Sequence, residues 1–495
     1  MQQMLTEGQS GRAVQTVEHV TASVRHLQGE HVQMQWGAVQ TWLGRWLRAR
    51  RHQHGRMCSL LGAVCWLVVG AGEAMATSVP PVRVLTSLSE QVVQAYQKVY
   101  QQRFPDETLV FERKNTNEIL RLLAPSSQAP RPDVVWMSSV DAFEVLARTR
   151  QLQATAMDVA SGIPERIGKL RIHAESGLYY GQSLAGYGIM FNRNYLRVHQ
   201  LPVPYQWADL VQPVYYGHVT LSAPARSGTM HMMVESILQG EGWDRGWSQL
   251  LQIAGNAAEI ARDSGKVPIY VQTGQVGVGM VIDAFGLSAK YSGQPVGFVY
   301  PDVSPMLPVS IGLVHRALNP EGGKRFMEFA LSRDGQQLLL DSRINRLPVM
   351  PQSMLQVPGG YPDPYEFARR SKLEYNAALS SERYALVTQL FEQTITNVFQ
   401  ELRATTAALH AAEQKLAKAP ARIRALLSRA RAQAYAPVVS ADMLRDERWM
   451  SALHANAGKP TVQLLQAWQM KARSNYAQAN TWIAQALEMG SAAGY

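Results

Sequence analysis

The sequence predicts an α/β region followed by an all-helical C-terminal part. From Val82 to Val349, short apolar runs of β type alternate with helical stretches, which is typical of an α/β fold with mainly parallel sheets. Near residues 358–362, which read Pro-Gly-Gly-Tyr-Pro, the composition changes and the rest of the chain has a helical pattern. Because 495 residues exceed what one hydrophobic core usually supports, we expect two or three structural units.

The first half of the α/β region contains three strand–helix pairs. We expect these strands at residues 82–85, 109–111 and 133–136, and the helices that follow them at 89–100, 116–123 and 140–148. Later strands are expected at residues 188–191, 219–221 and 277–282.

The C-terminal part has helical periodicity. One four-three apolar seam predicts a helix that packs on another helix, and its members are Phe391, Ile395, Val398, Leu402, Thr405, Leu409, Ala412 and Leu416. Pro420 is expected to end or kink this helix. Further helices are expected at 421–431 and 461–487, with one face formed by Trp468, Ala472, Ala479, Ile483 and Leu487. We interpret these helices as a bundle that packs on itself or on the α/β region; the alternative is a surface for a partner protein.

The N-terminal region has the order of a secretory signal. A basic run from Arg45 to Arg56 precedes the apolar residues 58–72 and the small-x-small triplet that ends at Ala76. We expect cleavage after Ala76 and a periplasmic protein, because the apolar run is too short to span about 30 Å of hydrocarbon comfortably. The residues before Arg45 fit no signal pattern, so we hypothesise that translation starts later, for instance at Met34.

Both cysteines lie inside this signal. Cleavage would therefore remove Cys58 and Cys65, which suits an oxidising compartment. A lipid on Cys65 is the less favoured alternative, because Val64 stands where a small residue is wanted.

Composition and charge narrow the class of partner. Hydrophobic residues make up 46% and charged residues 17% of the chain, as in a soluble globular protein. The formal net charge is +10, but no basic stripe interleaved with aromatic residues is present, so we expect no nucleic-acid partner. The charge supports no more than a mild attraction to anionic solutes or membrane surfaces. We expect membrane contact only through protein partners.

Polar turns follow the strands at four places. They comprise Thr86 to Ser89, Lys114 to Asn117, Ser138 with Ser139, and Arg226 to Thr229. A helix start offers unsatisfied backbone N–H groups and the positive end of a dipole, and Ser or Thr adds hydroxyl donors, so these turns suit a phosphate or carboxylate. The alternative at each turn is ordinary N-capping.

Other chemistry is not supported by the residue pattern. His231 and Glu235 are four apart on an expected helix, but two ligands do not make a metal site, so we favour structural roles. Gly274, Gly277 and Gly279 lack the dinucleotide-binding spacing. No nucleophile and base pairing stands out, so we expect no enzyme activity, no cofactor and no metal.

Five segments together have a recognisable order and spacing: Thr86-Ser87, residues 132–139, residues 186–192, residues 224–229 and residues 274–283. In this order they resemble the type 2 periplasmic solute-binding proteins of ABC transporters, most of all the hexose-phosphate binders and phosphoglycerate-transport regulatory proteins. The resemblance runs from about Val82 to about Pro348. It implies a two-lobed fold that closes over a ligand, with residues 82–187 plus a return segment in the first lobe and 188–283 in the second.

The resemblance also implies which residues line the cleft. One side would carry Thr86, Ser87, Ser138 and Ser139, faced by Ser227, Gly228 and Thr229. The polar turns add Asn115, Thr116 and Arg226, and Ser264 lies in a loop, Arg262 to Lys266, that departs from the Arg-Ser loop of relatives.

Asp283 is expected to accept hydrogen bonds from ligand hydroxyls, with a solvated or salt-bridged acid as the alternative. Ferric-ion binders of the superfamily have a tyrosine pair near this position. Here the residues are Asp283-Ala284-Phe285, so ferric iron is less favoured.

The expected organisation is an N-terminal extension with a signal peptide at 1–76, a two-lobed solute-binding domain at 77–360 and a helical extension at 361–495. The expected function is capture of a small phosphorylated organic anion, of the sugar phosphate or phosphoglycerate type, for an ABC permease. The alternative is a ligand-sensing regulator that signals to a membrane histidine kinase through the C-terminal helices.

Overall fold

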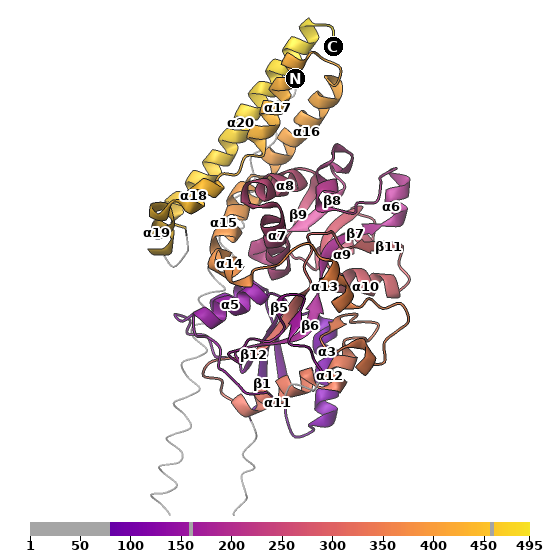
Figure 1. The fold of residues 1–495 in the computed structure, drawn as a ribbon, viewed down its shortest axis with the longest axis vertical. Helices are drawn as coiled ribbons and strands as arrows, with labels where there is room; N and C mark the ends of the chain where they lie inside the picture. Colours follow the sequence, from indigo (N-terminus) through magenta and orange to yellow (C-terminus); the bar gives the residue numbers. More distant parts are fainter. Residues whose placement is uncertain (1–79, 158–161, 456–459) are drawn as a thin grey trace, which may run out of the picture. The chain divides into compact units, whose positions relative to one another are not determined.

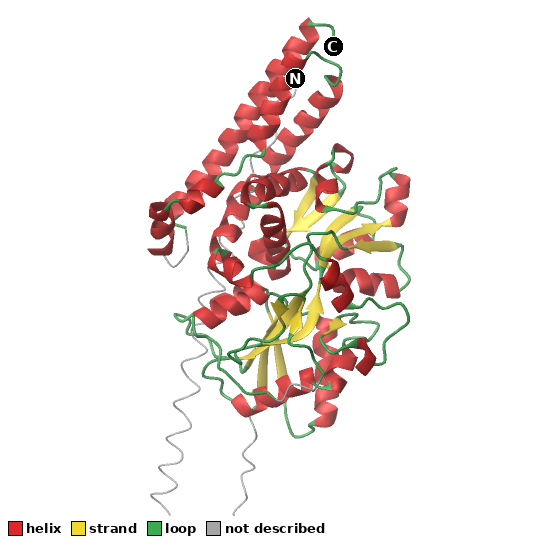
Figure 2. Ribbon diagram, viewed as in Figure 1, coloured by secondary structure: helices red, strands yellow, loops and turns green. Residues whose placement is uncertain are grey.

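The computed structural model describes residues 80–157, 162–455 and 460–495. The predictions about the signal peptide, the cleavage after Ala76, the start at Met34 and the two cysteines lie outside these residues. Residues Ser78–Tyr495 form one unit, in which two α/β lobes are followed by helices (Figure 1; Figure 2).

The first lobe is built on a six-stranded sheet with the order β13-β6-β12-β3-β1-β2. Its strands are β1 (Val82–Thr86), β2 (Leu109–Arg113), β3 (Val134–Met137), β6 (Tyr180–Ala185), β12 (Leu307–Leu313) and β13 (Leu347–Pro348). Its helices are α3 (Glu90–Arg103), α4 (Thr116–Leu122), α5 (Val140–Arg148), α11 (Pro320–Leu331) and α12 (Arg333–Leu338). A separate two-stranded ribbon joins β4 (Arg166–Ile167) and β5 (Leu170–Arg171).

The second lobe is built on a five-stranded sheet with the order β11-β7-β10-β8-β9. Its strands are β7 (Tyr187–Asn192), β8 (Val219–Ser222), β9 (Ala257–Ala261), β10 (Val278–Ile282) and β11 (Val296–Val299). Its helices are α6 (Arg193–Val198), α7 (Gly228–Glu241), α8 (Trp243–Gly255), α9 (Lys266–Gln272) and α10 (Asp283–Tyr291), with the short 3₁₀ segments η1 (Trp207–Val211), η2 (Pro213–Tyr215) and η3 (Pro224–Arg226).

The sheets are mixed, and the expectation of mainly parallel sheets was wrong. β1 pairs in parallel with β2 and β3, but β12 runs antiparallel to both β3 and β6. The reason is that the chain crosses between lobes at Gly186 and returns between β11 and β12, so the returning strand runs against its neighbours. The second lobe also continues past Asp283 to β11, further than the resemblance implied.

The C-terminal part is helical, as expected. It contains η4 (Gln352–Met354), α13 (Pro364–Arg370), α14 (Ala377–Glu382), α15 (Tyr384–Thr394), η5 (Thr396–Val398), α16 (Phe399–Lys415), α17 (Ala421–Ala434), α18 (Ala441–Arg445), α19 (Glu447–Ala455) and α20 (Val462–Ala492). The predicted apolar seam is buried throughout. It spans α15 and α16, which are separate helices because the backbone breaks at Ile395, and Pro420 begins α17 rather than ending its predecessor.

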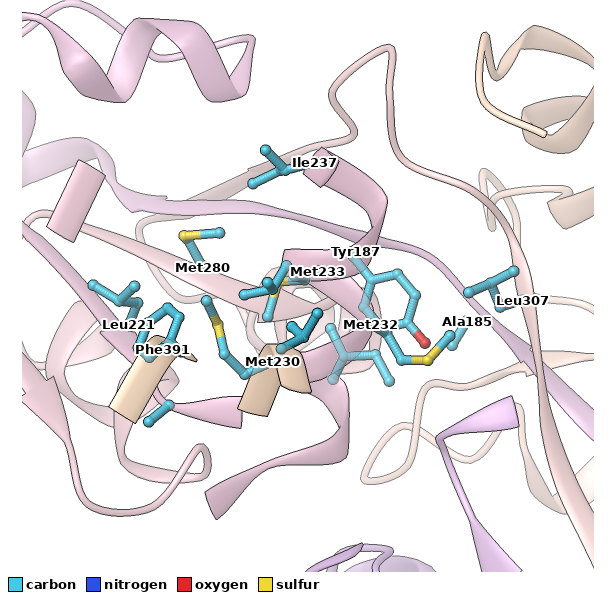
Figure 3. Packing of buried hydrophobic residues seen from close by; sticks show 14 of the residues in the cluster. Ala185, Tyr187, Leu221, Met230, Met232, Met233, Ile237, Met280, Leu307 and Phe391 are labelled. Carbon is cyan, nitrogen blue, oxygen red and sulfur yellow. The ribbon is translucent and has the colours of Figure 1, made fainter. Parts of the chain in front are cut away.

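These helices pack both on one another and on the lobes. α20 packs against α15, α16 and α17, while α14 contacts α5 of the first lobe and α15 and α16 contact α7 and α8 of the second. Figure 3 shows part of the core around α7, with the labelled residues Met230, Met232, Met233, Ile237, Leu221, Met280 and Phe391. Since Phe391 belongs to α15, the extension and the second lobe share one hydrophobic core.

Candidate functional site

A cavity of about 330 Å³ is lined by both lobes. The first lobe contributes Thr86, Ser87, Arg113, Lys114, Asn115, Thr116, Glu118 and Ser138, and the second contributes Arg226, Ser227, Gly228, Thr229, Arg262, Asp263 and Ser264. These residues follow the carboxyl ends of β1, β2, β3, β8 and β9, which is where ligands bind in open α/β sheets. The structure therefore brings ten of the twelve predicted site residues together.

The start of α7 forms one wall of the cavity. Ser227 is its N-cap, and the Ser227 hydroxyl oxygen accepts a hydrogen bond from the Met230 amide at 3.1 Å. The amides of Gly228 and Thr229 and the Thr229 hydroxyl have no hydrogen-bond partner among the described residues. A helix of 14 residues thus presents free donors and the positive end of its dipole to the cavity.

Gly228 lies where the two lobes approach each other closely. A Cβ at this position would lie 2.8 Å from the Thr116 Cβ and 3.0 Å from the Ser139 Cβ, both in the first lobe. Such distances are shorter than van der Waals contact, so only glycine fits here without a shift of one lobe.

In the first-lobe wall, several polar groups already form hydrogen bonds within the protein. The Thr86 hydroxyl donates to the Trp136 carbonyl at 2.7 Å, and the Ser87 hydroxyl accepts from the Ser138 amide at 3.4 Å. Asn115 forms a capping box with Glu118, at 2.9 Å from the Glu118 amide to the Asn115 side chain. N-capping therefore explains Asn115, while the Ser138 hydroxyl makes no hydrogen bond within the described part of the chain and remains able to donate to a ligand.

The lining carries four cationic and two acidic side chains. In the first lobe, Arg113 pairs with Glu90 at 3.1 Å and Lys114 with Glu112 at 3.5 Å. In the second lobe, Arg226 and Arg262 form no ion pair with any described residue. The lining cations that form no ion pair within the described residues therefore lie on the same side as the start of α7, although Arg226 also donates to the Ala261 carbonyl at 3.5 Å.

Two predicted residues do not line the cavity. The Ser139 hydroxyl is buried and donates to the Asp141 carboxylate. Asp283 is buried at the first turn of α10, where its carboxylate accepts from the Gly186 amide at 2.7 Å and from the Tyr300 hydroxyl at 3.1 Å. Burial raises the Asp283 pKa to about 7, although the Gly186 and Tyr300 hydrogen bonds act in the opposite direction.

Asp283 therefore belongs to the connections between the lobes. Gly186 joins β6 to β7, and Tyr300 directly follows β11 on the chain's return to the first lobe. The expected role in binding ligand hydroxyls needs an exposed carboxylate, and here the two interlobe segments occupy it.

Five lining residues were not among the predicted site residues: Arg113, Lys114, Glu118, Arg262 and Asp263. Of these, Lys114 lay in a predicted polar turn, and Arg262 and Asp263 lay in the loop that was predicted to depart from that of relatives. Arg113 ends β2 and precedes a turn that was already singled out, so its position at a strand end could have identified it. Arg262 and Asp263 follow β9, and this strand was not predicted because its sequence, Ala-Ala-Glu-Ile-Ala, carries a weak β signal.

The favoured structural role of His231 and Glu235 is confirmed. His231 Nδ1 lies 2.7 Å from the Asp141 carboxylate, and Glu235 pairs with Arg383 at 2.7 Å. Within the described ranges, no group of three or more His, Cys, Asp or Glu side chains is arranged to hold a metal ion.

Comparison with known proteins places this geometry in a class. Residues 129–361 match the family described as bacterial extracellular solute-binding protein. The chain is 28% identical over 351 residues to the phosphoglycerate transport regulatory protein PgtC of Salmonella typhimurium, which covers 70% of this chain and 83% of that protein.

Two solved structures share the fold. The periplasmic binding protein AfuA from Actinobacillus pleuropneumoniae, solved with fructose-6-phosphate bound, matches with a TM-score of 0.59 and 16% identity, over 64% of this chain and 98% of that chain. The periplasmic binding protein P5PA matches with a TM-score of 0.56 and 17% identity, over 65% of this chain and 99% of that chain.

The chain therefore has the two-lobed fold of a type 2 solute-binding protein with additional C-terminal helices. The predicted resemblance to type 2 solute-binding proteins, phosphoglycerate-transport regulatory proteins among them, is confirmed, and the two solved structures share the fold. In the ranges that the structure describes, no helix is both long and apolar enough to cross a membrane.

Proposed function

We propose that this protein captures a small phosphorylated organic anion in the cavity between its lobes. The observation that carries the proposal is the start of α7, where Gly228 and Thr229 line the cavity and where their amides and the Thr229 hydroxyl have no hydrogen-bond partner in the described part of the chain. Backbone N–H groups at a helix start favour phosphate, and hydrogen bonds to a charged group are about twice as strong as neutral ones. Arg226 and Arg262, which form no ion pair with any residue that the structure describes, add positive charge beside these donors.

The remaining lining supports an organic rather than a purely inorganic ligand. A volume of about 330 Å³ falls at the lower end of the range typical of small-molecule sites. Ser138 and Ser264 face the same cavity from the two lobes and can hydrogen-bond ligand hydroxyls. AfuA, which shares the fold, was solved with a sugar phosphate, and PgtC is named for phosphoglycerate transport.

Capture then requires closure rather than chemistry. The ligand's anionic group docks on the start of α7 while the first lobe meets it through Ser138. The lobes close around the two connections at Gly186 and Tyr300, a hinge motion of the kind found in ligand-binding proteins. The closed form delivers the ligand to an ABC permease. This role takes place in the periplasm, after cleavage of the signal at Ala76.

A second candidate is a regulator that reports the ligand to a membrane histidine kinase. Two observations favour it: the relative PgtC is named a regulatory protein, and the helices from α14 onward lie outside the matched family region. Purification of the tagged protein from detergent-solubilised membranes distinguishes the two. Recovery of a permease and its ATPase supports import, and recovery of a histidine kinase supports sensing.

A thermal-shift screen tests the proposal. A ligand that binds only the native state at 100 times its dissociation constant stabilises it by about 2.7 kcal/mol. The screen includes sugar phosphates, phosphoglycerates, phosphoenolpyruvate and ferric iron. We expect a phosphorylated compound to raise the melting temperature; stabilisation by ferric iron alone, with a visible tyrosinate absorption band, contradicts the proposal.

A further inference from the structure

A segment of the C-terminal extension contacts both lobes beside the cavity. We name residues 372–384 the interlobe strap. It comprises the chain that leads to α14, then α14 itself, then Arg383 and Tyr384 at the start of α15. On the first-lobe side, the Arg148 guanidinium donates to the Ser381 carbonyl at 2.9 Å. On the second-lobe side, the Asn376 amide donates to the Gln239 side chain at 2.8 Å.

The strap completes a buried polar cluster between the lobes. Asp141 of α5 and His231 of α7 are fully buried and lie 2.7 Å apart, and the Ser380 hydroxyl of the strap donates to the same Asp141 carboxylate at 2.8 Å. Burial alone would raise the Asp141 pKa, but His231 and the hydrogen bonds from Ser139 and Ser380 hold the pKa below its usual value. The carboxylate is therefore anionic, and three elements from two lobes and the strap converge on it.

A second strap contact lies on α7, one turn after His231. Arg383 binds the buried Glu235 carboxylate through Nε at 3.0 Å and Nη2 at 2.7 Å, a two-pronged arrangement that fixes direction as well as distance. Next to it, the Tyr384 ring stacks on His231 with 3.9 Å between ring centroids. The strap thus contacts two successive turns of α7.

These contacts lead directly to the cavity walls. α7 begins at Gly228 and Thr229, so His231 and Glu235 extend from the same rigid helix that presents the free amides. α5 begins after Ser139, and Ser139 is one of the first-lobe residues against which Gly228 packs. Any shift of α7 relative to α5 changes both the strap contacts and the cavity.

We propose that the interlobe strap positions α7 against the first lobe and thereby sets the arrangement of the two cavity walls. Its bearing on ligand affinity rests on the proposed function, but its bearing on interlobe geometry does not. If the strap only packs against the lobes, its loss lowers the stability of the protein and leaves the distance between the lobes unchanged. If the strap positions α7, its loss changes the distance between the lobes even when no ligand is bound.

Distance measurement between the lobes separates these two cases. In the full chain with Cys58→Ser and Cys65→Ser, spin labels are attached at Lys98→Cys on α3 and Val198→Cys on α6, both exposed and in different lobes. Pulsed electron paramagnetic resonance then gives the distribution of distances between the two spin labels in the absence of ligand.

Two strap variants and one control are compared. The pair Arg383→Met with Glu235→Gln removes the ionic contact without leaving a buried charge unpaired, and Ser380→Ala removes the hydrogen bond to Asp141. The control is Arg473→Ala, which breaks an exposed pair with Glu401 inside the bundle, 2.9 Å apart. We expect the distance distribution to shift or broaden in both strap variants and to match the wild type in the control.

A second measurement, calorimetric titration with inorganic phosphate, compares the affinities of the same variants. We expect the strap variants to bind phosphate about five- to a hundredfold more weakly, as for a typical coupling between sites. Unchanged distances in both strap variants overturn the proposal, whatever their melting temperatures. The proposed function fails if the wild type binds neither inorganic phosphate nor any phosphorylated compound of the thermal-shift screen, and in that case the distances alone decide whether the strap fixes the lobes.

Discussion

Two helix starts in the second lobe show how similar sequence signals lead to different roles. α7 follows β8 and α10 follows β10, both in the same sheet, and both starts were expected to contact the ligand. The start of α7 opens into the cavity, whereas Asp283 at the start of α10 is covered by Gly186 and Tyr300. The path of the interlobe connections therefore decides which strand end can meet a ligand.

The largest effect is expected at Asp283. Because its pKa is raised from 3.8 to about 7, the native state keeps a proton that the unfolded state has lost between these values, so stability falls as pH rises through this window. At 1.36 kcal/mol per unit the loss amounts to about 4 kcal/mol. Asp283→Asn keeps an acceptor oxygen but does not titrate.

Denaturant unfolding from pH 4 to pH 8 checks this prediction. We expect the stability of Asp283→Asn relative to wild type to increase with pH and to level off above about pH 7. Other groups titrate in both proteins, so only the difference between the two curves reports on Asp283. Parallel curves would show that the carboxylate is not held neutral at the lobe connections.

The next effect concerns the Thr229 hydroxyl. Thr229→Val removes one donor and nearly preserves shape, and losing a hydrogen bond to a charged group costs about 1.5–3 kcal/mol, roughly ten- to a hundredfold or slightly more in affinity. Calorimetric titration with the ligand selected by the thermal-shift screen measures it. Thr481→Val on α20, exposed and away from the cavity, is the matched control and should bind like wild type. Equal affinities of both variants would place the anion elsewhere.

The close approach of the lobes at Gly228 gives a third test. Gly228→Ala inserts a methyl group against Thr116 and Ser139, and overpacking of this kind costs about 1–3 kcal/mol. We expect weaker ligand binding, because the closed arrangement has to open to admit the methyl group. Gly359→Ala is the control, since a Cβ there meets nothing within 4 Å. If both variants retain wild-type affinity in titration, the walls do not need to meet at Gly228.

The smallest effect separates capping from binding on α7. The structure assigns the cap to the Ser227 oxygen, so Ser227→Ala should lower the stability of the ligand-free protein by about 1 kcal/mol. Thr229→Val should leave it nearly unchanged, because its hydroxyl has no partner among the described residues. Thermal melts without ligand compare the two. A larger loss in Thr229→Val than in Ser227→Ala would reverse these assignments.

Local features of the fold could be predicted, and long-range ones could not. β1 and β3 were predicted because runs such as Val82 to Leu85 are mainly apolar and are followed by polar turns. The helix seam was predicted from its spacing, but the break at Ile395 carries no Gly or Pro signal. Gly186 and Asp283 lie 97 residues apart, and nothing in their local sequence indicates that they bond.

The same limit applies to the candidate site. Ser227 to Thr229 were found because hydroxyl residues before a helix have a local physical meaning. Arg113 pairs with Glu90, which lies 23 residues away, whereas Arg262 forms no ion pair within the described ranges. This difference depends on which acidic side chains the fold brings near each arginine. Sequence reasoning can therefore name donors at helix starts, while the fold decides which of them stay free.

A crystal structure of the protein with the phosphorylated ligand selected by the thermal-shift screen tests the central claim most directly. The account predicts that phosphate oxygens accept hydrogen bonds from the Gly228 and Thr229 amides and the Thr229 hydroxyl, at about 2.7–3.2 Å, with Asp283 still bonded to Gly186 and Tyr300. A ligand bound outside this cavity, or one whose hydroxyls reach Asp283 while the start of α7 remains free, would contradict it.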